Sequence, residues 1–135
     1  MLRIACLACL VAAPSMAMAE GLVVELNAIE PAETSCRISL MVENGLGADI
    51  TALGVEAVLF DRSGKVLRLV TLDLQDAPKA RPRLRQFDLP GLDCAGIGRV
   101  LVNAVAPCTG EGLPAPACQG ALHLRSRVDG IEVIG

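Results

Sequence analysis

Residues 36–43 carry an apolar side chain at every second position, and this period constrains the fold more than any other feature of the chain. The alternating apolar residues of this run are Cys36, Ile38, Leu40 and Val42. A period of two residues is typical of a β-strand that buries one face. We expect the strand to end at residues 44–45, where Asn is followed by Gly.

A second apolar run, residues 55–60, is too short and too rich in β-branched residues for a helix. It stops at residues 61–64, which read Asp-Arg-Ser-Gly. Asp and Ser side chains accept hydrogen bonds from turn amides, and Gly accepts a positive φ. A tight turn is therefore predicted here, joining two strands into a hairpin.

The remaining chain reads as further short strands with turn residues between them. Pro31 is expected to end the first strand, and Pro78 and Pro82 indicate a crossing loop or a sheet edge. A helical stripe is missing from every window of eleven or more residues. The pattern predicts an all-β fold, an immunoglobulin-like two-sheet antiparallel sandwich of about seven strands. Besides the two runs above, strands are expected at residues 22–28, 65–73, 83–89, 98–106, 121–128 and 131–134.

Residues 1–19 have the form of a signal peptide. Arg3 precedes an apolar run of about ten residues, and residues 17–19 form an Ala-Met-Ala cleavage site. The run is shorter than the ~20 residues needed to span a bilayer. We therefore expect cleavage before Glu20, a single domain over residues 20–135, a periplasmic or secreted location and no membrane insertion after cleavage.

Four cysteines remain after the predicted cleavage: Cys36, Cys94, Cys108 and Cys118. An even number in a short exported chain indicates disulfides. We predict the pairs Cys36–Cys94 and Cys108–Cys118, since the Gly- and Pro-rich segment between the last two lets the chain turn back on itself. Reduced structural thiols are the alternative, followed by zinc, whose usual closely spaced cysteine pairs are missing from the sequence.

Charge and aromatic content exclude several classes of partner. Loss of Arg3 with the leader leaves 11 basic and 15 acidic residues, a net charge of −4. Phe60 and Phe87 are the only aromatic residues. Nucleic-acid binding, which needs positive charge and stacking platforms, is not expected.

The central stretch resembles the FxLYD-type domains, small immunoglobulin-like sandwiches of bacterial exported proteins. The resemblance covers about a quarter of the chain and implies an extracytoplasmic interaction or spacer module. It implies no catalytic residue. The matching residues are Val42, Asn44, Gly45, Val55, Val58, Leu59, Phe60, Asp61, Gly64, Lys65 and Val66.

Catalytic, cofactor-binding and metal-binding residues are not predicted. His123 is the single histidine, and Ser126 and Asp129 follow it on what reads as one strand. Members of a hydrolytic triad normally come from separate elements. We expect His123 to face solvent and the protein not to be an enzyme.

Three arginines occupy alternate positions of an extended segment: Arg81, Arg83 and Arg85. This spacing would place three guanidinium groups in a row about 7 Å apart. One interpretation is a candidate site for an acidic or phosphate-bearing partner. The other, which we favour, is a charged outer face that protects an edge strand, neutralised by Asp73 or a Glu across the ladder.

The sequence thus favours a non-enzymatic periplasmic β-sandwich that binds or supports another envelope protein. A small-molecule carrier is one alternative, as is a metal carrier that binds copper through Met41 and the cysteines. A small hydrolase using His123 is the other.

Overall fold

The computed structural model describes residue 13 and residues 21–114 and 116–135. The predicted signal peptide and its cleavage site therefore lie almost wholly outside the described residues.

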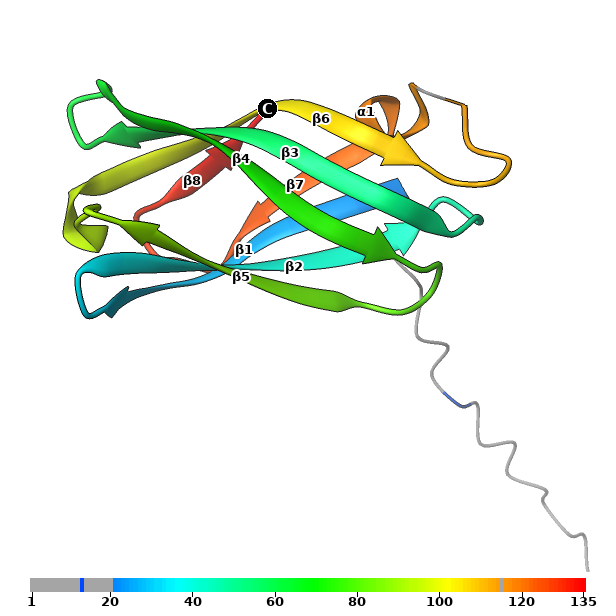
Figure 1. Ribbon diagram of the computed structural model, residues 1–135, viewed down its shortest axis with the longest axis horizontal. Helices are drawn as coiled ribbons and strands as arrows, with labels where there is room; N and C mark the ends of the chain where they lie inside the picture. Colours follow the sequence, from blue (N-terminus) through cyan, green and yellow to red (C-terminus); the bar gives the residue numbers. More distant parts are fainter. Residues whose placement is uncertain (1–12, 14–20, 115) are drawn as a thin grey trace, which may run out of the picture.

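Eight strands form two four-stranded sheets that face each other as a sandwich (Figure 1). Sheet A has the order β5-β2-β1-β7, and sheet B has the order β4-β3-β6-β8. The predicted all-β sandwich is confirmed. The strands are β1 (Gly21–Ala32), β2 (Ser35–Gly45), β3 (Ile50–Asp61), β4 (Val66–Ala77), β5 (Arg83–Pro90), β6 (Ile97–Thr109), β7 (Leu122–Ser126) and β8 (Glu132–Ile134). Two short helical turns, η1 (Cys94–Gly96) and α1 (Ala117–Gly120), complete the described elements.

The sheets are mixed, which corrects the expectation of a purely antiparallel sandwich. β7 lies parallel to β1 and β8 lies parallel to β6, whereas the other four pairings are antiparallel. After β6 the chain crosses from sheet B to sheet A for β7, and then returns to sheet B for β8. β7 and β8 thus each join the edge of a sheet instead of forming a hairpin with the preceding strand. Turn residues in a sequence predict hairpins, so they could not predict the direction of these two strands.

β1 continues through Pro31 to Ala32, so the prediction that Pro31 ends this strand was wrong. β7 pairs only with the Leu22–Leu26 part of β1, and the second half of β1 pairs with β2 alone. A residue without an N–H group is tolerated where a strand lies at a sheet edge.

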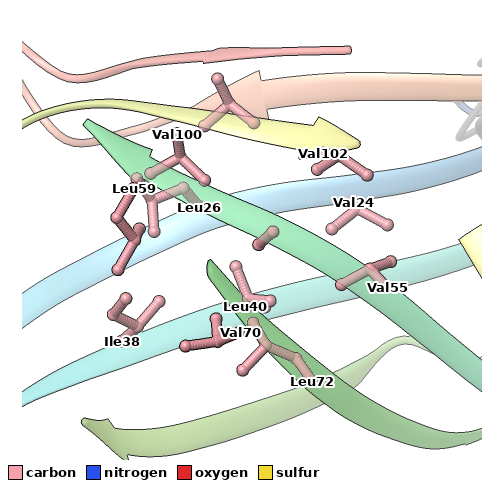
Figure 2. A pocket seen from close by; sticks show the side chains of 12 residues that line it. Val24, Leu26, Ile38, Leu40, Val55, Leu59, Val70, Leu72, Val100 and Val102 are labelled. Atoms are coloured by element: carbon pink, nitrogen blue, oxygen red, sulfur yellow. The ribbon is translucent and has the colours of Figure 1, made fainter. Parts of the chain in front are cut away.

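The core is built from aliphatic side chains of both sheets. Leu26, Leu40, Leu59 and Val102 face one another between the layers (Figure 2). The cavity that remains among them measures about 20 Å³, which is room for about one water molecule and has no polar side chain to bind it. Ligand pockets usually measure several hundred Å³, so this cavity is a packing defect and not a binding site.

The hairpin predicted at residues 61–64 is present between β3 and β4. One carboxylate oxygen of Asp61 accepts hydrogen bonds from the Ser63 amide, the Ser63 hydroxyl and the Lys65 amide at 2.7–2.9 Å. Gly64 has φ +87°, the left-handed conformation that a residue with a side chain adopts only with strain. The hydrogen bonds to the charged form lower the pKa of Asp61.

Candidate functional site

Both predicted disulfides are present. Cys36 at the start of β2 is bonded to Cys94 in η1, with Cα atoms 5.2 Å apart. Cys108 near the end of β6 is bonded to Cys118 in α1, with Cα atoms 6.2 Å apart. The first bond ties sheet A to the connection that enters sheet B, and the second closes the crossover that leads to β7.

His123 lies exposed on β7, opposite Val23 of β1, as the alternation predicted. The Ser126 hydroxyl is used within the following turn, where it donates to the Ile131 carbonyl at 2.5 Å. Within the described ranges, three or more His, Cys, Asp or Glu side chains do not gather in a way that could hold a metal ion. Among the same residues, no helix has the length and apolar character to cross a membrane.

The three arginines do not form one row. Arg81 lies in the loop before β5, while Arg83 and Arg85 lie on β5, which is an edge strand as predicted. Arg85 pairs with Leu40, and Arg83 pairs with Val42. Both partners face the core, so these two arginines are on the inner face of sheet A. The prediction of an outer face was wrong.

The inner position of Arg85 is explained by the hydrogen bonds that it makes. Its Nε donates to the Leu74 carbonyl at 2.8 Å, and its Nη2 donates to the Asp76 carbonyl at 3.0 Å and to the Asp76 carboxylate at 2.8 Å. Arg83 also lies 3.6 Å from that carboxylate. Asp76 on β4 is therefore the counter-charge, in place of the expected Asp73.

Arg68 makes the reciprocal contact from sheet B. Its Nη1 donates to the Pro90 carbonyl at the end of β5, at 2.6 Å. Arg68 and Arg85 thus link the edge strands β4 and β5 at two points. Inward-pointing charges on edge strands oppose aggregation by pairing of one sheet edge with the edge of another molecule. These bonds support the structural interpretation of Arg83 and Arg85, and binding of an acidic partner by Arg81, Arg83 or Arg85 stays an untested prediction.

The outer face of sheet A is largely polar. Arg37 donates two hydrogen bonds to Asp88, at 2.7 and 2.9 Å, which raises the pKa of Arg37 and lowers the pKa of Asp88. Glu25 is buried on this face and accepts from the guanidinium group of Arg127 at 2.9 Å. In both of these pairs the two charges compensate each other.

The outer face of sheet B is different, because an apolar row crosses all four of its strands. Leu69 of β4 pairs with Val58 of β3, Val58 pairs with Leu101 of β6, and Leu101 pairs with Ile134 of β8. Val58 is buried but lies outside the core cluster, which places it on the outer face. Leu69 is 56 % exposed. We call these four residues the apolar row.

More apolar surface adjoins the row at the β4 edge. Val66, which pairs with Phe60, is 62 % exposed and Leu67 is 40 % exposed. With Leu69 they make up three of the four large apolar side chains that are most exposed in the described part of the chain, the fourth being Leu84 on sheet A. Val66 and Leu69 therefore both expose apolar surface on the outer face of sheet B, at its β4 edge.

The two ends of this face differ in charge. Glu56 and Asp73 lie on one side of the apolar row. Arg99 lies on the other side, together with its ion-pair partner Glu132 at 3.4 Å. At the Arg99 end a surface hollow of about 310 Å³ is lined in part by Phe60, Asp61, Arg62, Arg99 and Ile134. The face therefore combines an apolar centre, an acidic end and a hollowed end of mixed charge.

The sequence analysis did not identify this face, although a signal for it exists. Residues 58–60, 66–67 and 100–102 are runs of consecutive apolar residues. In a strand such a run supplies apolar side chains to both faces. These runs predict a second apolar surface, but the pairing register that aligns them into one row depends on contacts between distant segments.

Comparisons with known proteins bear on the fold. Neither a protein-family model nor a curated protein sequence matches the chain, so the resemblance to FxLYD-type domains stays a prediction. The solved structure of IrmA from Escherichia coli is similar to this chain, with a TM-score of 0.59 and 9 % sequence identity. The match covers 78 % of this chain and 92 % of IrmA. At this identity the likeness shows that the two chains share a fold and nothing more.

Proposed function

We propose that this protein is an exported, non-enzymatic β-sandwich that binds another protein chain through the outer face of sheet B. The apolar row, with Leu69 exposed at its β4 end, is the observation that carries the proposal. Large contiguous apolar surfaces on small proteins mark interaction sites, because each exposed aliphatic side chain costs free energy in water. A polar or charged rim around an apolar centre is the usual composition of a protein interface.

Export is supported by the two disulfides. They fit an oxidising compartment outside the cytoplasm, because cytoplasmic thiols are kept reduced. The form of residues 1–19 adds the more specific proposal of a signal peptide and a periplasmic location.

Site-specific photo-crosslinking tests the proposed function in cells. The full chain is expressed with its leader in a Gram-negative bacterium, with a photoreactive amino acid in place of Val66, which lies on the outer face of sheet B. The matched control carries it in place of Leu84, which is 48 % exposed on sheet A. We expect position 66 to yield a product that contains a second polypeptide, and position 84 to yield none.

Fractionation and intact mass test the export proposal in the same cells. We expect the chain in the periplasm, starting at Glu20, with four cysteines oxidised. Retention in the cytoplasm, or an absence of crosslinks at position 66, would overturn the proposed function.

A further inference from the structure

The last two residues of β2, Asn44 and Gly45, form the only Asn-Gly pair in the sequence. In such a pair the amide nitrogen of the glycine can attack the side-chain amide carbon of the asparagine, because a residue without a side chain leaves this approach open. The other two asparagines, Asn27 and Asn103, each precede an alanine, whose methyl group hinders the same approach. Asn44 is therefore the most reactive asparagine of the unfolded chain.

In the folded protein the Asn44 side chain is held away from this reaction. It is 3 % exposed. Its nitrogen donates to the carbonyls of Ala48 and Ala77, and its oxygen accepts from the Leu46 amide. Both residues of the pair also lie in the β1–β2 ladder, which holds their backbone extended. The Gly45 nitrogen therefore reaches the Asn44 side chain only after these bonds break.

The segment that follows Ala77 is fastened to the same place by two further contacts. The Ala80 amide donates to the main-chain carbonyl of Asn44 at 3.1 Å, and the Lys79 amide donates to the Asp49 carboxylate at 2.8 Å. We call residues 44–49 and 77–80 the Asn44 corner. Proteins open locally as well as globally, and opening of this corner is the smallest change that frees the Asn44 side chain.

We propose that Asn44 is a deamidation site that the fold protects, and that opening of the Asn44 corner permits a modification that closing does not reverse. The Gly45 nitrogen loses its proton and bonds to Cγ of Asn44, the bond from Cγ to Nδ2 breaks, and ammonia leaves. Water then opens the resulting succinimide ring at either of its carbonyls and gives aspartate or isoaspartate. The reaction consumes water alone and needs neither an oxidant nor a reductant.

The product does not rebuild the corner. A carboxylate at position 44 has no N–H group to donate, so the carbonyls of Ala48 and Ala77 lose their donor and face a negative charge. Isoaspartate also lengthens the main chain by one carbon, which disturbs the pairing of β2 with β1. Each opening that ends in reaction thus leaves a less stable molecule. The inference is independent of the proposed function, because it concerns no residue on the outer face of sheet B.

Peptide mapping of the exported, oxidised protein by mass spectrometry tests the inference. The protein is incubated at neutral pH, once folded and once unfolded in guanidinium chloride. We expect deamidation at Asn44 to be at least about tenfold faster in the unfolded chain, since reaction in the folded protein is limited by the small population of open molecules. Asn27 and Asn103 are the internal controls and should react slowly in both states. Equal rates at Asn44 in the two states, or no reaction in the unfolded chain, would overturn the inference.

A variant that loosens the corner separates local opening from global unfolding. Asp49→Ala removes the acceptor of the Lys79 amide and should speed deamidation of the folded protein about fivefold, the effect that loss of one hydrogen bond has on an opening equilibrium. Asp93→Ala is the matched control, because it removes a similar bond to the Ala95 amide at the other end of β2, and it should leave the rate at Asn44 unchanged. Equal rates in the two variants would overturn the role of the Asn44 corner.

Refolding tests whether the change is permanent. Chains that have reacted in guanidinium chloride are separated by charge from unreacted chains, and both are returned to native buffer. The reacted chains should then unfold at a lower denaturant concentration than the unreacted ones. Recovery of the wild-type midpoint would contradict the claim that the product does not rebuild the corner.

Discussion

The Nη2 atom of Arg85 lies 2.8 Å from the Oδ1 atom of Asp76, and this ion pair joins the two sheets across one open side of the sandwich. The same guanidinium group satisfies the carbonyls of Leu74 and Asp76 on β4. Both carbonyls belong to β4, an edge strand that has a neighbouring strand, β3, on one side alone. Arg85 therefore supplies charged hydrogen-bond donors to the backbone of this edge strand.

Replacement of Arg85 by alanine should lower the free energy of unfolding by about 1–3 kcal/mol, because two backbone acceptors lose a charged donor. Chemical denaturation measures the change. Arg81→Ala is the control: this side chain is exposed and forms no ion pair with the described residues, so its effect should stay within about 0.5 kcal/mol. Equal effects of the two variants would contradict the role of Arg85.

The position of Arg85 also shows what alternation can and cannot predict. The pattern at residues 83–89 correctly predicted a strand, and the prolines correctly predicted an edge. Phe87 and Leu89 share the parity of Arg85 and occupy the core side. These two apolar residues therefore determine the face, and Arg85 is turned inward with them. Asp76 could not be identified as its partner, since the contact depends on how the two sheets stack.

A similar division holds for the rest of the molecule. Local patterns predicted the strands and the Asp61 turn, because each depends on residues near in sequence. The short Gly- and Pro-rich segment between Cys108 and Cys118 predicted their bond, which left Cys36 and Cys94 as the other pair. The parallel placement of β7 and β8 and the alignment of the apolar row depend on long-range register. In this chain, turn chemistry and periodicity do not encode that register.

Asp61 should make the stability depend on acid pH. Its pKa in the folded protein is lowered by the bonds from Ser63 and Lys65, whereas the unfolded value is about 3.9. The stabilisation is therefore complete above about pH 4 and is lost as the pH falls through the folded pKa. Urea denaturation measures the free energy of unfolding of the wild type and of Asp61→Asn. The difference between the two proteins should narrow below about pH 4.

The comparison removes other titrating groups from the result. Asp88, whose pKa is also lowered, is present in both proteins, so its contribution cancels. A difference in unfolding free energy that widens toward acid pH would contradict the lowered pKa of Asp61.

Asn44 should be among the least replaceable polar residues. Its side chain is buried, donates to the carbonyls of Ala48 and Ala77 at 2.8 and 2.7 Å, and accepts from the Leu46 amide at 2.9 Å. Asn44→Ala should cost about 1–3 kcal/mol, because buried groups lose their partners. Asn44→Asp keeps the acceptor but places a carboxylate beside two carbonyls. It should be less stable than the alanine variant at pH 7 and recover in part when acid protonates it, as thermal unfolding at both pH values would show.

The two disulfides should differ in what they contribute. The Cys36–Cys94 bond spans a sequence separation of 58 and the Cys108–Cys118 bond spans 10. In the chain-entropy model, their removal costs roughly 4 and 3 kcal/mol, respectively, because a longer closed loop restricts the unfolded chain more. Paired Cys→Ala variants test this by denaturation without reductant. With reductant the wild type should lose both contributions and unfold more readily than either variant in its oxidised form.

Non-reducing peptide mapping is the independent check on the pairing. A linked peptide that joins Cys94 to Cys108 would contradict it, and a larger loss of stability from the Cys108–Cys118 variant would show that loop length does not govern these two bonds.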